Sequence, residues 1–172
     1  MAILYEVRNG KRDYMPLVKT EIFDELLSAE INGKVKCGGC FISPINPVAS
    51  MEEVSGYFGE SRGLQLVHFI VEFEPMELRD PNIVGHIANL LAQDIGGRYQ
   101  TFWVLHDNDE YLHFHFIINP VSYIDGSRYP DANDSSNLEF VKFRATLEVI
   151  LRCNRVRSLQ YVPACVGNIP AS

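Results

Sequence analysis

Three histidines, His106, His113 and His115, have the residue type and spacing that best fit a chemical role, and they fall within ten positions of a chain with five histidines in all. They lie in two strand-like runs joined by a polar turn. Side chains alternate between the two faces of a strand, so His113 and His115 share a face. Neutral imidazoles that converge on one surface bind a metal ion and leave positions open for water or substrate. We therefore predict a three-histidine metal site.

The turn between the two runs decides whether His106 joins the other two histidines. If residues 107–110 form a four-residue hairpin turn, His106 stands opposite Tyr111 and on the face of His113 and His115. A bulge, or a loop that differs by one residue, would turn His106 away. A lone histidine in a strand is usually a partly buried, hydrogen-bonded residue, so the metal interpretation depends on this register.

The length and composition are those of an ordinary globular chain. It has 172 residues, of which 47% are hydrophobic and 22% charged, and this predicts one domain that buries its own core. No apolar run approaches the length that spans a membrane, and the first residues lack the layout of a secretion signal, so we expect a cytoplasmic protein. Cys37 and Cys40 form an isolated CGGC, interpreted as structural, with half of a zinc site or a redox pair as the alternative.

The charge distribution bears on nucleic-acid binding. The formal net charge of −7 argues against a large phosphate-binding surface, which needs clustered lysines and arginines. The balance is uneven, because residues 135–172 carry five basic side chains against two acidic ones. A local basic surface is compatible with the acidic total, although arginines on a helix usually form its solvated face.

The remaining segments supply the elements that must position the histidines. Asp80 followed by Pro81 begins a helix whose apolar stripe starts at Ile83, and Ser50 with Glu53 forms a capping box. The expected strands cover residues 2–8, 35–43, 64–73 and a hairpin over 99–123, and the expected helices cover residues 17–29, 50–58, 80–95 and 137–152. This order, β-α-β-α-β-α-β-β-α, predicts an α+β fold with helices on one face of a mainly antiparallel sheet.

The histidine segment resembles the metal-binding motif of relaxases, the mobilisation nucleases of plasmids and integrative elements within the HUH (His-hydrophobic-His) endonuclease group. The pattern H-x6-H-x-H-x3-N runs from His106 to Asn119 and is followed by PVSYIDGSRY. Residues 71–77, VEFEPME, are similar to the family's S-F-x-P-G-E segment. Residues 39–40, before a proline-rich loop, resemble its G-x-N-C region. The resemblance covers roughly residues 2–160.

The resemblance implies a fold, an activity and partners. The fold is a two-layer sandwich of a mainly antiparallel sheet with flanking helices, in a single nuclease domain over residues 1–172 that corresponds to a truncation at the C-terminus, since relaxases are usually longer. Relaxases hold a divalent cation, Mg²⁺ or Mn²⁺, which polarises a phosphodiester of single-stranded DNA at an origin of transfer. A tyrosine attacks that phosphate and leaves a 5′-phosphotyrosyl link. Accessory mobilisation proteins are further expected partners.

The same resemblance assigns the nucleophile. A tyrosine shortly before a Lys-Thr pair is the family's arrangement, and Tyr14 precedes Lys19 and Thr20 here. Tyr5 is the reserve candidate. A tyrosine is a poor nucleophile until nearby positive charge favours its phenolate, which a bound cation supplies.

Further residue roles follow from the resemblance. The metal ligands are His106, His113 and His115. The side chains that orient the ligand imidazoles are Asn119, Asp107 and Asp109. The basic side chains that contact DNA are Arg12, Lys19 and Arg128. His68 points from an apolar strand and is interpreted as a buried, hydrogen-bonded histidine rather than a fourth ligand.

The chain departs from the family pattern at several positions. Asn108 stands where relaxases commonly have an aspartate, and Glu72 and Met76 replace the serine and glycine of the S-F-x-P-G-E segment. These departures keep three alternatives open. One is a rolling-circle replication initiator, for which Tyr161 is the only tyrosine after the last helix. The others are a non-catalytic DNA-binding accessory protein and a metal-dependent hydrolase of a small substrate.

Overall fold

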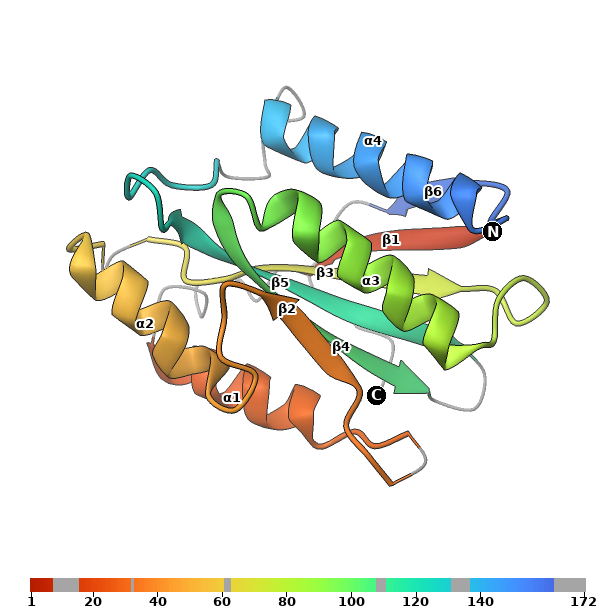
Figure 1. Cartoon of the computed structure of the whole chain (residues 1–172), viewed down its shortest axis with the longest axis horizontal. Helices are drawn as coiled ribbons and strands as arrows, with labels where there is room; N and C mark the ends of the chain where they lie inside the picture. The colour runs from red at the N-terminus through yellow and green to blue at the C-terminus, as the bar shows by residue number, and fades with distance from the viewer. Residues whose placement is uncertain (8–15, 32, 61–62, 108–110, 131–136, 163–172) are drawn as a thin grey trace.

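The computed structural model describes residues 1–7, 16–31, 33–60, 63–107, 111–130 and 137–162. Within these ranges, one six-stranded sheet has the order β2-β4-β5-β3-β1-β6 (Figure 1). The strands are β1 (Ala2–Val7), β2 (Cys37–Cys40), β3 (Val67–Phe73), β4 (Tyr99–Asp107), β5 (Leu112–Ser122) and β6 (Leu159–Val162). Every neighbouring pair is antiparallel except β1 and β6. The predicted α+β class and mainly antiparallel sheet are confirmed, and β6 is an additional edge strand that the sequence patterns did not predict.

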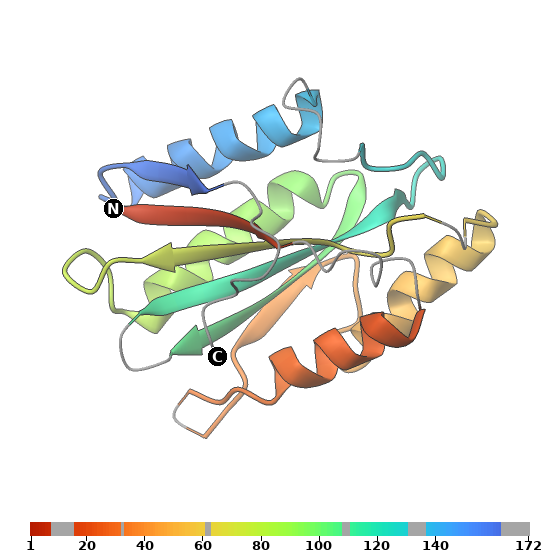
Figure 2. The same cartoon turned by 180° about the vertical axis from the view of Figure 1, so that it is seen from behind.

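Helices lie on both faces of this sheet. They are α1 (Pro16–Leu27), α2 (Pro47–Tyr57), α3 (Pro81–Ile95) and α4 (Leu138–Cys153). Figure 1 shows α3 in front of the strands, and Figure 2, from behind, brings α1 to the front. The expectation of helices on one face therefore holds for α3 and α4 only. Among the described residues, no helix has the length and apolar character needed to cross a membrane.

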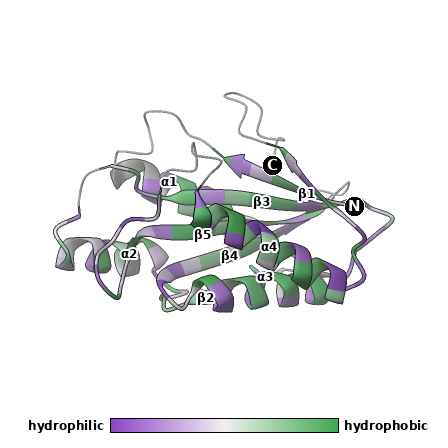
Figure 3. Cartoon of the chain, turned by 90° about the horizontal axis from the view of Figure 1, so that it is seen from above, coloured by the Kyte–Doolittle hydropathy of each residue, from purple (hydrophilic) through white to green (hydrophobic). Residues whose placement is uncertain are grey.

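Strand alternation divides the core into two clusters. On the α3/α4 face, Phe69 of β3 stacks on Phe143 of α4 with ring centroids 4.5 Å apart. On the opposite face, Phe23 of α1 packs against Phe102 of β4 at 5.3 Å. Colouring by hydropathy shows long hydrophobic stretches in β3, β4 and β5 (Figure 3). Because both faces of these strands are covered, their side chains are buried almost throughout.

The helix starts follow local capping chemistry. Asp80 caps α3 as predicted, because its carboxylate accepts the backbone N–H of Asn82 at 2.8 Å. The helix expected over residues 50–58 is present as α2, but its predicted cap was wrong: Asn46 is the cap, and Pro47 takes the first helical position, which needs no N–H donor. The apolar stripe of α3 also begins one residue later than expected, with Ile83 exposed.

The hairpin register differs from the predicted one by two residues. His106 pairs with His113, and Asp107 pairs with Leu112, so β4 ends one residue later and β5 begins one residue later than expected. His106 therefore does not stand opposite Tyr111. A shift of two residues keeps every side chain on its face, whereas a shift of one would have reversed it. His106 thus joins the other two histidines despite the error.

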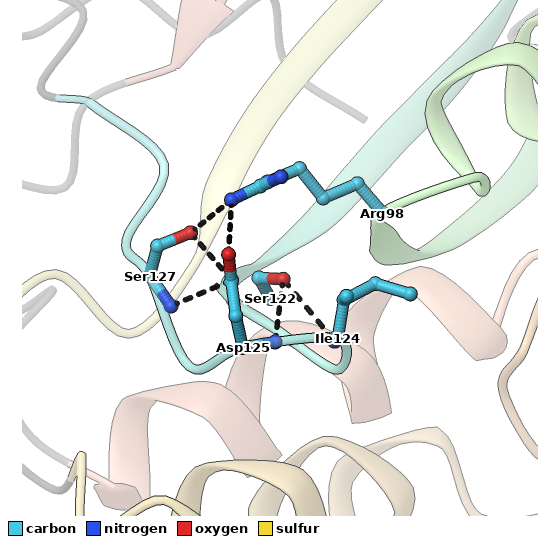
Figure 4. A network of polar contacts seen from close by, with 5 residues as sticks. All are labelled: Arg98, Ser122, Ile124, Asp125 and Ser127. Atoms are coloured by element: carbon cyan, nitrogen blue, oxygen red, sulfur yellow. Dashed lines mark hydrogen bonds and ion pairs between the residues drawn. The ribbon is translucent and has the colours of Figure 1, made fainter.

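The turn after β5 is held by a polar network (Figure 4). Arg98 donates to Asp125 at 2.7 Å and to Ser127 at 2.6 Å. Ser122 accepts the backbone N–H of Ile124. Hydrogen bonds from Ser127 and Ser122, together with the guanidinium of Arg98, lower the pKa of Asp125 to about 2. This turn contains the DGSRY segment and lies at the opposite end of β5 from His113, so its contacts stabilise the fold rather than the histidine cluster.

Candidate metal centre

The three histidines predicted as ligands meet on one face of the sheet. His106 extends from β4 and His113 and His115 from β5, on the face that α1 covers. One ring nitrogen from each lies within 4.8 Å of the others, and all three side chains are buried. The ring centroids of His106 and His115 are 4.5 Å apart. Among the described residues these are the ones that form such a cluster.

Backbone carbonyl groups fix the orientation of two of the rings. The Nε2 of His106 lies 2.9 Å from the carbonyl oxygen of Leu26, in the last turn of α1. The Nδ1 of His113 lies 3.3 Å from the carbonyl oxygen of Tyr111. A carbonyl oxygen only accepts, so each of these nitrogens carries the hydrogen, and the other nitrogen of the neutral ring keeps its lone pair. His106 is then free to bind a cation through Nδ1 and His113 through Nε2.

His115 has a different partner, the imidazole of His68 on β3. The Nδ1 of His115 and the Nε2 of His68 are 2.9 Å apart, and both rings are buried. His68 is thus a buried, hydrogen-bonded histidine, as its position in an apolar strand predicted. The Nε2 of His115 is also buried and has no hydrogen-bond partner within the described part of the chain.

Burial keeps this cluster neutral. It is the largest cause that lowers the pKa of each of His106, His113, His115 and His68, and for His68 the value falls to about 4. Neighbouring imidazoles lower the pKa of His113, His115 and His68 further, while the Leu26 carbonyl opposes the shift at His106. Neutral imidazole is the form that coordinates a metal. The cluster is therefore in the ligand form at pH 7.

These observations fit a divalent cation. A buried polar atom without a partner is costly, and the Nε2 of His115 is such an atom, placed among the other two imidazoles. A cation bound by His106, His113 and His115 would satisfy it. Three nitrogen ligands leave further coordination positions for water or a phosphate oxygen.

Two further side chains lie on the face of the three histidines: Glu72, which was not predicted as part of the site, and Tyr5, the reserve candidate for the nucleophile. Glu72 of β3 lies directly across from His113 in the sheet, and burial raises its pKa. Tyr5 of β1 pairs with Ile70, which pairs with His115. Burial and the Glu72 carboxylate both raise the pKa of Tyr5. The signal for Glu72 was available: alternation in VHFIVEF places it on the face of His68, but the strand was interpreted as continuously apolar.

Asn119 does not lie against an imidazole. Its amide nitrogen donates to the Met51 carbonyl at 3.2 Å and to Gln100 at 2.8 Å, and its oxygen accepts the N–H of Val121. Four residues along a strand separate it from His115, which is about 13 Å. The proposed orienting role is corrected accordingly: Asn119 joins α2 to the sheet. Asp107 is exposed at the end of β4 and acts on His113 only by raising its pKa electrostatically.

Two of the three predicted DNA-contacting side chains, those of Lys19 and Arg128, are described by the structure, and both are engaged within the protein. The side chain of Lys19 is buried, and burial lowers its pKa. The guanidinium of Arg128 bonds to the Glu60 carboxylate at 3.2 Å and to the Leu64 carbonyl. Neither side chain presents its charge freely to a phosphate. Tyr14, Arg12 and Asp109 lie outside the described residues.

Cys37 and Cys40 do not form a paired site. They are three residues apart on one strand, so their side chains point to opposite faces, and both are free thiols. Close packing accounts for the glycines between them, since a Cβ on Gly39 would lie 2.1 Å from the Thr101 carbonyl oxygen. The structural interpretation of CGGC is the one that this geometry supports.

The sheet is mainly antiparallel and carries three converging histidines on two adjacent strands, and comparison with known proteins identifies the class in which it belongs. Residues 22–149 match the relaxase family, described as MobA/VirD2-like, nuclease domain. The chain belongs to this family. A solved structure described as "Molecular Basis of Vancomycin Resistance Transfer in Staphylococcus aureus" is similar at 14% identity, with a TM-score of 0.46 over 74% of this chain and 73% of that one. No curated protein matches the chain.

Proposed function

We propose that this relaxase-family chain nicks single-stranded DNA at an origin of transfer, using a tyrosine nucleophile and a divalent cation, Mg²⁺ or Mn²⁺. The observation that carries the proposal is the cluster of His106, His113 and His115, with the unpartnered Nε2 of His115 among them. Family membership over residues 22–149 supports the same activity. The fold places all three ligands on two paired central strands, which favours a fixed site.

The reaction is a transesterification and needs no external energy source. The tyrosine oxygen attacks the scissile phosphorus and the bond from phosphorus to the 3′-oxygen breaks. The tyrosine gives up its proton and the departing 3′-oxygen takes one, which leaves a free 3′-hydroxyl and a 5′-phosphotyrosyl link. A bound cation would polarise the phosphate and favour the phenolate. The neutral imidazoles of His106, His113 and His115 would hold the cation without adding a positive charge of their own.

Tyr14 is the proposed nucleophile, and Tyr5 is the alternative. Tyr14 is proposed from its position shortly before Lys19 and Thr20, and it lies outside the described residues. Tyr5 lies on the ligand face, two strands away from His115. The carboxylate of Glu72 disfavours the phenolate of Tyr5, since it raises the pKa of that group. Tyr14 therefore remains the better candidate.

Adduct formation tests this proposal. The protein is incubated with Mn²⁺ and labelled single-stranded DNA from its genetic neighbourhood, and a covalent protein–DNA species is sought on a denaturing gel. We expect the adduct in the unmodified protein, in Tyr5→Phe and in the control Tyr57→Phe, which alters an exposed tyrosine. We expect its loss in Tyr14→Phe and His113→Ala. An adduct that survives Tyr14→Phe but not Tyr5→Phe reassigns the nucleophile.

A non-catalytic DNA-binding protein is the second candidate function. One observation favours it: Glu72 replaces the serine of the family's S-F-x-P-G-E segment and lies directly across from His113 in the sheet. Under this alternative the protein binds the same DNA, seen as a mobility shift on a native gel, but forms no covalent adduct with it in the presence of Mn²⁺. An adduct at a defined position excludes it.

A further inference from the structure

We propose that His68 is a positioning residue for the metal centre: its Nε2 accepts the Nδ1 hydrogen of His115 and so holds the Nε2 of His115 as a ligand. The inference rests on the proposed metal site, and it adds a residue from a third strand, β3, to the two strands that supply the ligands. The observation that carries it is the 2.9 Å separation of the two nitrogens in a buried environment.

The partner of His115 differs in kind from the partners of the other two ligands. His106 and His113 face backbone carbonyl oxygens, which only accept hydrogen bonds. Their ligand nitrogens are therefore available whether or not a cation is bound. His68 is a neutral imidazole, so its Nε2 can either donate or accept. The hydrogen between His68 and His115 thus has two possible directions.

Only one of these directions allows His115 to bind a cation. If the Nε2 of His68 donates, the Nδ1 of His115 accepts, and the hydrogen of His115 sits on Nε2, inside the cluster. If the Nε2 of His68 accepts, His115 carries its hydrogen on Nδ1, and the lone pair of its Nε2 faces the other ligands. Metal-ligating histidines generally donate their second N–H to such an outer acceptor, which fixes the tautomer and ring orientation.

The packing of His68 suits this task. Its side chain is buried, and it pairs across the sheet with Val7 of β1 and Ile117 of β5. Apolar neighbours restrict the ring, and its contact with the His115 ring has centroids 5.2 Å apart. Its Nδ1 has no partner within the described residues, so among them the bond to His115 is the hydrogen bond that orients the ring.

Metal affinity of matched variants tests the proposal. Mn²⁺ binding is measured by titration for the full chain, for His68→Leu and for His68→Gln, whose side-chain oxygen is able to accept the Nδ1 hydrogen. We expect His68→Leu to weaken binding roughly 10–100-fold, as loss of an outer partner does. His68→Gln should stay within a few-fold of the unmodified protein. His86→Gln, on the exposed surface of α3, is the control.

Each outcome has a distinct meaning. Equal Mn²⁺ affinity in the unmodified protein and in His68→Leu overturns the role of His68, and so does a loss in His68→Gln as large as that in His68→Leu. No Mn²⁺ binding by the unmodified protein overturns the proposed metal site itself. Circular dichroism melts show which variants are folded, and if His68→Leu is unfolded, the imidazole nitrogen spectra of the unmodified protein decide between the two directions of the hydrogen bond.

Nitrogen NMR of the imidazoles gives an independent readout. In the Mg²⁺-saturated protein, His115 should carry its hydrogen on Nδ1, and His68 should carry its own on Nδ1 with Nε2 unprotonated. A hydrogen on the Nε2 of His68 in that state contradicts the proposal. This readout does not depend on DNA cleavage.

Discussion

The Nε2 of His106 and the carbonyl oxygen of Leu26 are 2.9 Å apart, although 80 residues of sequence separate them. The carbonyl belongs to the last turn of α1, where backbone oxygens lack partners within the helix and carry partial negative charge. A helix end thereby orients one histidine of the proposed metal site. The position of α1 is part of the site, although α1 supplies no ligand from its described side chains.

Loosening α1 should therefore reduce metal affinity as well as stability. Phe23 anchors α1 on Phe102, and Phe143 anchors α4 on the opposite face. Truncation of either buried ring to alanine should cost about 3–5 kcal/mol of unfolding free energy. Mn²⁺ titration should show weaker binding for Phe23→Ala and unchanged binding for Phe143→Ala in the folded protein. Equal Mn²⁺ affinities of Phe23→Ala and Phe143→Ala would show that the position of α1 does not affect metal binding.

Asn119→Ala should affect stability without affecting the metal. The substitution leaves the Gln100 side chain and the Met51 carbonyl without their buried donor, at a cost of roughly 1–3 kcal/mol. Because Asn119 is about 13 Å along the strand from His115, Mn²⁺ affinity should be unchanged. Urea unfolding measures the loss of stability, and Mn²⁺ titration of the same preparation measures the affinity. A large loss of affinity would restore the orienting role that the family resemblance implied.

The metal-free protein should lose stability as the pH falls below about 6.5. His68 has a pKa of about 4 in the folded state against 6.5 ordinarily. Above pH 6.5 it is neutral in both states. Between these values only the unfolded chain takes up the proton, so unfolding becomes easier by about 1.4 kcal/mol per pH unit for each such histidine.

Urea unfolding from pH 7 to pH 5 measures this slope. In His68→Gln, one proton-binding group is absent from the unfolded chain, so the fall in unfolding free energy should be shallower than in the unmodified protein. Identical slopes in the two proteins would show that His68 is not held neutral. Mn²⁺ added at pH 7 should raise the unfolding free energy, since the folded state alone presents the three ligands together.

Arg155→Gly should stabilise the protein. Arg155 follows α4 with φ of 67°, the left-handed region where a side chain is unfavourable, and the N–H of Val156 bonds back to the Leu151 carbonyl at 2.9 Å. Glycine at this position should gain about 1 kcal/mol. Arg157→Gly removes the same charge where φ is not positive, so it should give no gain. Thermal melts of the two variants decide, and a lower melting temperature for Arg155→Gly contradicts the prediction.

Strand alternation was sufficient to predict the face of the ligands. The period of two placed His113 and His115 together, and His106 joined them because the register error was two residues rather than one. The turn composition could not reveal where pairing stops, since Asp107 is equally compatible with a strand end and a turn. The face on which the three histidines meet was therefore predicted better than the pairing of the hairpin that carries them.

The sequence patterns could not reveal which groups form hydrogen bonds to the predicted ligand histidines. The Leu26 carbonyl is a backbone group, and no residue type marks it. His68 was correctly interpreted as buried and hydrogen-bonded, but its partner depends on the order of β3 and β5 in the sheet, which only the tertiary fold determines. Lys19 was misplaced for a similar reason, because its burial follows from the packing of α1 rather than from its own charge.

The ligands stand on β4 and β5, which are paired with further strands on both sides and covered on both faces. Their geometry is thus maintained by the core rather than by the ion, in contrast to small zinc domains that unfold when their metal is removed. The protein should therefore remain folded when no ion is bound. The supply of the cation would then determine the fraction of molecules able to nick DNA, and it would not change the amount of folded protein.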